Sequence, residues 1–172
     1  MADKMRVMIS EEQVSKRIRE LAEQISKDYE GKSVHLICIL KGSIFFGCDL
    51  AKRITVPVTF DFMSVSSYGN ETVSSGRVRI LKDLDESIQD KNVLIVEDII
   101  DSGRTLAFLR DLLGSRAPES LTICTLLDKP DRRETDVYVK YVGFEIPDEF
   151  VVGYGLDYNQ QYRNLPYVGV IE

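Results

Sequence analysis

The chain has 172 residues, 44% of them hydrophobic, which suits one globular domain with a substantial core. Acidic residues outnumber basic ones, 28 against 22, and the formal net charge of −6 argues against a nucleic-acid-binding protein, whose usual footprint is basic. The three cysteines include no C-x-x-C pair, so the sequence indicates neither a disulfide framework nor a zinc site. No apolar segment is long enough to span a bilayer, and the first residues lack a signal peptide. We therefore expect a cytoplasmic protein without nucleic-acid or membrane partners.

Helical and apolar segments alternate from the start of the chain. A helix is predicted from about Ser10 to Tyr29, where Ser10 and Gln13 form a capping-box pattern. The continuous apolar run Val34–Leu40 is typical of a strand buried on both faces. A second helical pattern then runs to about Arg53.

The middle of the chain continues this alternation. Its predicted elements are a strand over Val58–Ser64, a mobile polar loop over Ser66–Gly76, a strand over Arg77–Leu81, a short buried strand over Val93–Val96, a helix from about Thr105 to Leu113, and a strand over Leu121–Leu127. Strands alternating with helices imply βαβ units, so we predict an α/β fold with a largely parallel sheet, in a single domain over residues 1–172. The last third, after Lys129, consists of short strands and turns and is predicted to pack at the C-terminal edge of the sheet.

The segment Val93–Thr105 has the clearest chemical signal. Its apolar strand delivers two adjacent carboxylates, Glu97 and Asp98, to the carboxyl end of the sheet, where ligands of open α/β sheets bind. The residues Asp101–Thr105 then form a tight turn into a helix, whose free N–H groups and dipole suit a phosphate. Taken alone, an aspartate or serine in this turn could equally be a helix cap. Together, an acidic pair and a phosphate cradle match a sugar phosphate.

The same segment resembles the phosphoribosyl pyrophosphate (PRPP) signature of type I phosphoribosyltransferases. Other segments resemble the bacterial hypoxanthine-guanine phosphoribosyltransferases over nearly the whole chain: Leu40–Ser43 the pyrophosphate loop, Ser66–Gly69 the start of the closing loop, Leu127–Lys129 the end of the purine-recognition strand, and Pro147–Tyr158 the base-binding hood. This resemblance implies a type I phosphoribosyltransferase fold. In that fold a twisted sheet flanked by helices has a small hood, built here mainly from the N-terminal segment and about residues 129–172.

The resemblance also implies an activity in purine salvage, in which the phosphoribosyl group of PRPP passes to hypoxanthine or guanine to give IMP or GMP and pyrophosphate. Mg²⁺ is the implied cofactor, held near Glu97, Asp98 and Asp157, and Asp101 is the implied catalytic residue that takes the purine proton. The binding residues that it implies are Glu97 and Asp98 for the ribose; Asp101, Ser102, Gly103, Arg104 and Thr105 for the 5′-phosphate; Lys41, Gly42 and Arg163 for pyrophosphate; Lys129, Phe150, Val151 and Asp157 for the purine; and Ser67 and Tyr68 for the closing loop.

Two other functions stay open at this point. A regulator of the same fold would use PRPP as an effector, but it would need a basic face or an added nucleic-acid-binding domain, and we expect neither from the net charge and length. A transferase that prefers xanthine is a closer alternative, whereas Lys129 as a donor to O6 disfavours adenine. The pair Arg132 and Arg133 is interpreted as part of a solvated turn. We expect a homo-oligomer, a dimer or a tetramer, although the sequence does not fix which.

Overall fold

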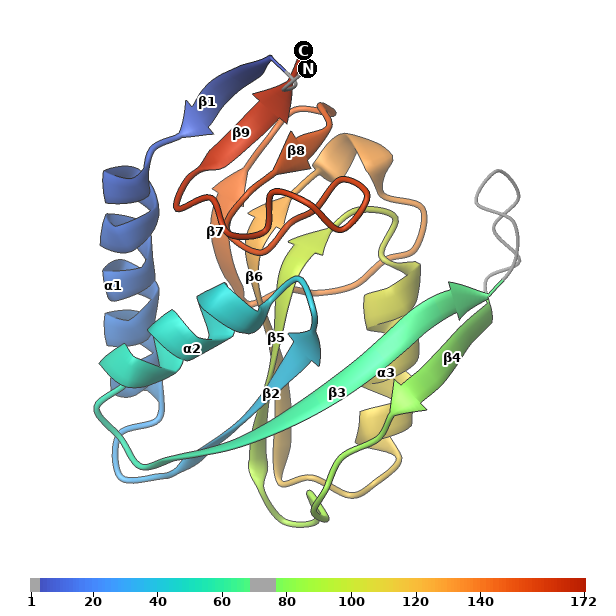
Figure 1. Cartoon of the computed structure of the whole chain (residues 1–172). Helices are drawn as coiled ribbons and strands as arrows, with labels where there is room; N and C mark the ends of the chain where they lie inside the picture. Colours follow the sequence, from blue (N-terminus) through green and yellow to red (C-terminus); the bar gives the residue numbers. More distant parts are fainter. Residues whose placement is uncertain (1–3, 69–76) are drawn as a thin grey trace.

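Two β-sheets organise the chain in the computed structural model, which describes residues 4–68 and 77–172 (Figure 1). The elements in chain order are β1 (Met5–Ile9), α1 (Glu11–Asp28), β2 (Val34–Leu40), α2 (Ile44–Arg53), β3 (Val58–Tyr68), β4 (Arg77–Lys82), β5 (Asn92–Ile100), α3 (Arg104–Gly114), β6 (Ser120–Asp128), the 3₁₀ turn η1 (Pro130–Arg132), β7 (Tyr141–Glu145), β8 (Val151–Val152) and β9 (Val168–Ile171). The larger sheet has the strand order β4-β3-β2-β5-β6-β7 and is parallel except for the β3–β4 pair. The predicted α/β class with a largely parallel sheet is confirmed.

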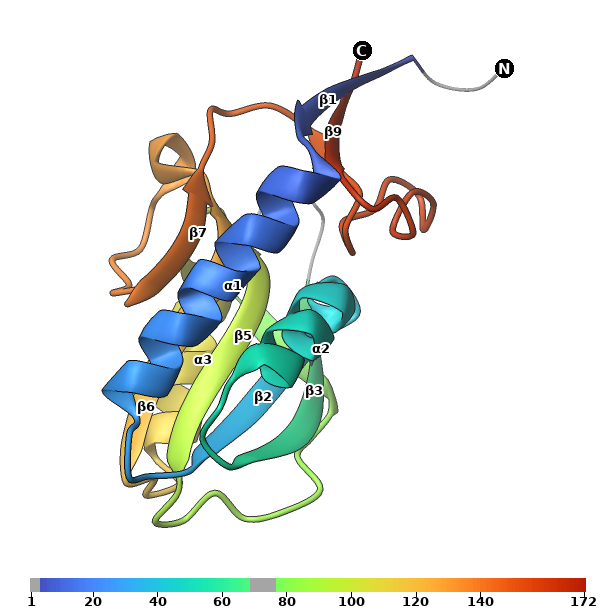
Figure 2. The same ribbon diagram turned by 90° about the vertical axis from the view of Figure 1, so that its left-hand side faces the viewer.

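Helices cover both faces of the larger sheet, with α1 and α2 on one face and α3 on the other (Figure 2). Neighbouring side chains of β2 therefore enter different cores: Leu36 packs with α1 and α2, whereas Ile37 packs with α3. This double burial explains the continuous apolar run of β2. The start of α1 also forms as predicted, because the Ser10 side chain accepts a hydrogen bond from the Gln13 N–H and the Gln13 side chain accepts one from the Ser10 N–H. None of the described helices is long and apolar enough to cross a membrane.

The strands β4 and β6 exceed their predicted ranges by one or two residues, and β3 and β5 extend further beyond their predicted ends. The strand β3 runs to Tyr68, because the backbone of Val65–Tyr68 pairs with β4, so the prediction of a loop starting at Ser66 was wrong. The rest of that predicted loop, residues 69–76, lies outside the described part of the chain. The strand β5 continues to Ile100, since its carboxyl end pairs with β6. Glu97 and Asp98 therefore belong to the strand itself, where the ladder fixes their backbone.

The hood is a separate three-stranded antiparallel sheet in the order β1-β9-β8. Met5 pairs with Ile171, so the two ends of the chain lie side by side in this sheet (Figure 1). The Arg6 guanidinium bonds the carboxylates of Glu149 and Glu172, which joins the three segments of the hood. The strand β7 does not belong to the hood: it extends the larger sheet in parallel to β6.

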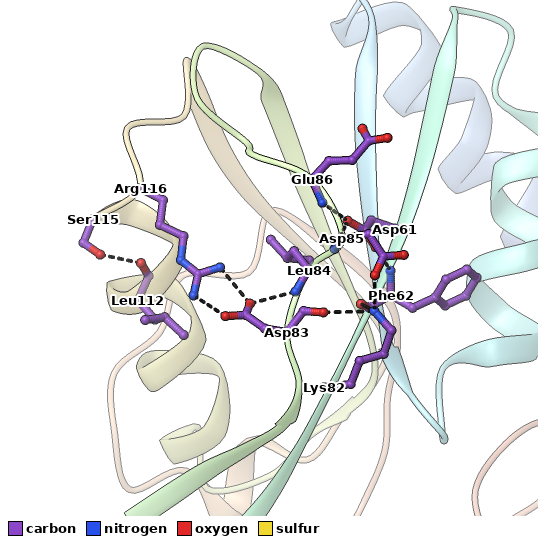
Figure 3. Close-up of polar contacts among 10 residues, drawn as sticks. All are labelled: Asp61, Phe62, Lys82, Asp83, Leu84, Asp85, Glu86, Leu112, Ser115 and Arg116. Atoms are coloured by element: carbon purple, nitrogen blue, oxygen red, sulfur yellow. Dashed lines mark hydrogen bonds and ion pairs between the residues drawn. The ribbon is translucent and has the colours of Figure 1, made fainter.

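A polar cluster fastens the connection between β4 and β5 to its neighbours (Figure 3). The buried Asp61 carboxylate of β3 accepts hydrogen bonds from the backbone N–H groups of Phe62, Asp85 and Glu86. Beyond the end of α3, Arg116 donates from both terminal nitrogens to the two Asp83 oxygens, at 2.8 Å each, and this pair lowers the pKa of Asp83. The connection is thus tied to the sheet on one side and to the end of α3 on the other.

Candidate active site

The carboxyl ends of β2, β5 and β6 all point toward the hood (Figure 1). Three predicted segments lie at these ends. The Lys41–Ser43 turn follows β2, the acidic pair lies in the last part of β5 with the phosphate turn directly after it, and Lys129 follows β6. Because parallel strands end at the same edge of a sheet, segments far apart in sequence meet at this edge.

The predicted phosphate turn lies directly between β5 and α3. Gly103 has φ 88° and is the N-cap of α3, a left-handed conformation that favours glycine. Within the described residues, the backbone N–H groups of Ser102, Gly103 and Thr105 make no hydrogen bond. They border a hollow of about 220 Å³ that Glu97 and Asp98 also line. The structure therefore brings the acidic pair and the predicted cradle to one cavity.

Glu97 and Asp98 are neighbours with strongly perturbed acidity. Burial, together with the adjacent Asp98 carboxylate, raises the pKa of Glu97 well above its ordinary value. Burial also raises the pKa of Asp98, against hydrogen bonds from Glu97 and the Ile99 N–H and the positive charge of Arg163. Two neighbouring carboxyl groups with raised pKa values suit a partner that carries positive charge, because such a partner stabilises their ionised forms.

Gly42 lies against this acidic pair. The Leu40–Lys41 peptide bond that precedes it is cis. A Cβ atom at Gly42 would stand 2.0 Å from Asp98 Oδ2, and a Cβ atom at Gly155 of the hood would stand 2.0 Å from the Gly42 carbonyl oxygen. Both glycines are needed because the Asp98 side chain lies against Gly42 and the Gly42 backbone lies against Gly155, which leaves no room for a further side chain.

Lys41 and Arg163, both predicted for pyrophosphate, converge on one side chain of the hood. Each donates to Oε1 of Gln160 at 3.2 Å. Arg163 also donates to the Gly155 carbonyl at 2.7 Å, and its Nη2 lies 3.3 Å from Asp157 Oδ1. Sequence reasoning did not find Gln160, because 119 positions separate it from Lys41 and no local pattern marks it.

On the purine side, Lys129 is buried at the end of β6, and its Nζ lies 3.8 Å from Asp148 Oδ1. Phe150 is 54% exposed, and its ring packs edge-on against Tyr158 with 5.6 Å between ring centroids. Val151 is buried in β8 and pairs with β9. An exposed aromatic ring and a buried lysine are side chains that suit a flat heterocycle with an acceptor at its edge.

Asp101, the predicted catalytic residue, has a buried carboxylate oxygen. No described residue donates a hydrogen bond to its Oδ1, although Arg132 Nε lies 3.3 Å away. The Nη1 atom of Arg132 is also 3.6 Å from Asp148 Oδ2, so Arg132 spans Asp101 and the hood. The interpretation of Arg133 as solvated was wrong: its guanidinium bonds the Asp101 carbonyl and the Asp128 carboxylate.

The described residues do not settle two predicted features, the closing loop and the metal site. Ser67 and Tyr68 end β3, and their role in a closing loop stays a prediction because residues 69–76 are not described. Among the described residues, no group of three or more His, Cys, Asp or Glu side chains could hold a metal by itself. Glu97 and Asp98 nevertheless fit Mg²⁺, which proteins usually hold with one or two carboxylates while substrate phosphates and water complete the shell.

The predicted cradle, the acidic pair and the parallel sheet together are typical of an enzyme that acts on a sugar phosphate. The phosphoribosyl transferase domain family matches residues 8–159, so the chain belongs to that family. A hypoxanthine phosphoribosyltransferase of Salmonella typhimurium is 57% identical over 167 residues, covering 96% of this chain and 94% of that protein. A bifunctional TilS/HprT protein of Listeria monocytogenes is 51% identical over 170 residues, and the match spans 26% of its length.

Solved structures agree with these relatives. A hypoxanthine-guanine phosphoribosyltransferase of Bacillus anthracis superimposes with a TM-score of 0.95 at 51% identity, covering 99% of this chain and 100% of that one. The protein belongs to the hypoxanthine-guanine phosphoribosyltransferases, the pentosyl-transferring enzymes of purine salvage. The family resemblance drawn from the sequence is confirmed.

Proposed function

We propose that this site transfers the phosphoribosyl group of PRPP to N9 of a 6-oxopurine, hypoxanthine or guanine, with Mg²⁺ bound. The observation that carries the proposal is the single hollow in which the free N–H groups of Ser102, Gly103 and Thr105 lie beside the Glu97–Asp98 pair. A helix N-terminus with free amides binds a phosphate, and adjacent carboxylates accept hydrogen bonds from ribose hydroxyls. The two groups thus match the two ends of one phosphoribosyl unit.

The chemical step exchanges one bond at C1 of the ribose for another. The C1–O bond to pyrophosphate breaks with its electron pair going to pyrophosphate, while the purine nitrogen forms the new bond to C1. Bound Mg²⁺ would neutralise the charge of pyrophosphate, and Glu97, Asp98 and Asp157 are the residues that would hold it. Lys41 and Arg163 add positive charge, and the Gly42 backbone allows close approach.

Asp101 takes the proton that the purine loses when its nitrogen attacks. The buried Oδ1 atom of Asp101 accepts no hydrogen bond from the described residues and is held only by the ion pair with Arg132, which supports its role as a proton acceptor. Lys129 donates to the purine O6, which favours 6-oxopurines over adenine, whose 6-amino group is a donor. Phe150 stacks on the base and the Val151 backbone reads its edge.

Initial-rate measurements at saturating PRPP test the proposal. With Mg²⁺ we expect turnover of hypoxanthine and guanine, little turnover of adenine, and loss of activity in excess EDTA. Undiminished turnover in EDTA would refute the metal, and equal rates with adenine would refute the role of Lys129. A chain that binds PRPP but turns over no base would instead be a regulator, and a preference for xanthine would change the substrate alone. Sedimentation tests the expected dimer or tetramer.

A further inference from the structure

The segment that follows β6 is bonded to the back of the phosphate turn. The Lys129 N–H donates to the Ile100 carbonyl at 3.0 Å, and the N–H groups of Glu134 and Thr135 both donate to the Ser102 carbonyl at 2.9 Å. Two successive stretches of the turn are thus held through their carbonyl oxygens by one segment, residues 129–135. The purine-side lysine and the phosphate turn are parts of one bonded unit.

Arg133 supplies the missing contact in the middle of this unit. Its Nε donates to the Asp101 carbonyl at 3.1 Å, and its Nη2 bonds the Asp128 carboxylate. The Arg133 and Asp128 side chains are only 24% and 13% exposed. The Arg133 Cδ atom also lies 3.1 Å from the place that a Cβ atom would take at Gly103. A planar, always charged guanidinium can make both contacts at once, which an ammonium does less well.

The position of Arg133 has a direct effect on the amide that follows Asp101. In a planar trans peptide the C=O and N–H groups point in opposite directions, so a donor that fixes the Asp101 carbonyl also fixes the Ser102 N–H. The same geometry links the Ser102 carbonyl, held by Glu134 and Thr135, to the Gly103 N–H. A positive charge at the carbonyl end further polarises the amide, which strengthens its N–H as a donor to an anion.

We propose that Arg133, held in place by Asp128, is a positioning residue that sets the amides of the 5′-phosphate cradle before the substrate binds. It acts through the Asp101 carbonyl and does not touch the phosphate. The inference rests on the proposed phosphate role of Ser102–Thr105. Its consequence is specific: loss of Arg133 weakens the part of nucleotide binding that depends on the 5′-phosphate, and leaves the part that depends on the base.

The test measures Kd for IMP and Kd for inosine by calorimetry, because the ratio of Kd for inosine to Kd for IMP isolates the contribution of the 5′-phosphate. In Arg133→Met we expect this ratio to fall about tenfold, equivalent to about 1.4 kcal/mol. Arg133→Lys keeps the positive charge but cannot contact the Asp101 carbonyl and the Asp128 carboxylate at once as the guanidinium does. Its ratio should therefore lie between those of the wild type and Arg133→Met. Arg116→Met is the matched control: it removes the guanidinium paired with Asp83 beyond the far end of α3 and should lower Tm with the ratio unchanged.

The outcomes separate this inference from the proposed function. A wild-type ratio near one, or an unchanged ratio in Gly103→Val, would overturn the cradle itself. If the ratio changes in Gly103→Val but not in Arg133→Met, only the role of Arg133 is overturned. An arginine that is merely structural would lower Tm in Arg133→Met and leave the ratio unchanged. If Arg133→Met does not fold, Arg133→Lys and Asp128→Asn decide, because both retain a polar partner; wild-type ratios in both would refute the inference.

Discussion

Replacing Gly42 by alanine tests how closely the predicted pyrophosphate loop must approach the acidic pair. The added Cβ would lie 2.0 Å from Asp98 Oδ2 and 2.7 Å from Asp98 Cγ, so the carboxylate or the loop must move by about 1 Å or more. Asp98 is anchored by its hydrogen bond from the Ile99 N–H at 2.8 Å, and overpacking of such sites costs about 1–3 kcal/mol. If that strain falls on the bound state, kcat/KM for PRPP drops by about fivefold to 150-fold.

The assay is kcat/KM for PRPP at saturating hypoxanthine and Mg²⁺, with Tm measured on the same samples. Gly114→Ala is the control, because its Cβ would meet only Leu121 Cδ2 at an ordinary 3.8 Å, and alanine in a helix is favourable. Gly155→Ala should be the most severe variant, since its Cβ would meet backbone at 2.0 Å and its φ is 100°. Wild-type kcat/KM in Gly42→Ala would show that the loop and the carboxylate do not need this contact.

Four further outcomes are expected. Asp101→Asn should lower kcat by about 10²–10⁴-fold while Kd for IMP is kept; near-normal kcat would make it only a cap. Lys129→Gln should weaken the preference for hypoxanthine over adenine, measured as the ratio of kcat/KM values. Because folding raises the pKa of Glu97, the free energy of unfolding falls as pH rises from the ordinary pKa of a glutamate to the raised one. Glu97→Gln should therefore raise Tm at neutral pH while lowering kcat. An unchanged Tm would contradict this sign. Arg104→Ala should weaken PRPP binding less than Gly103→Val, because Arg104 pairs outward with a glutamate; the reverse order would mean that the guanidinium holds the phosphate.

The sequence predicts well wherever local pattern and tertiary position agree. The apolar run of β2 and the capping box of α1 were found because burial on two faces and a helix start leave direct marks in the sequence. The acidic pair and the phosphate turn follow from the same logic, since both lie at the end of a buried strand.

The missed features depend on partners far along the chain. The end of β3 was misplaced because Ser66 and its neighbours are polar, and only their backbone pairing with β4 makes them strand. Arg133 was read as solvated because it stands among charges, while its burial depends on the distant Asp101 carbonyl and on Asp128. Gln160 joins Lys41 to Arg163 only after the hood folds over the sheet.

The meeting of both chain ends in the hood has a consequence for the order of folding. The Arg6–Glu172 contact closes a loop across 166 positions, whereas the βαβ units of the larger sheet close much shorter ones. Closing a long loop costs more conformational entropy than closing a short one, and this cost comes before the contact can stabilise the fold. We therefore expect the hood to assemble last. The half of the site that we propose holds the phosphoribosyl unit would then be formed while the half proposed to hold the purine is still open. We also expect the hood to be the part of the native protein that opens first, which would let a base exchange without disturbing the sheet beneath it.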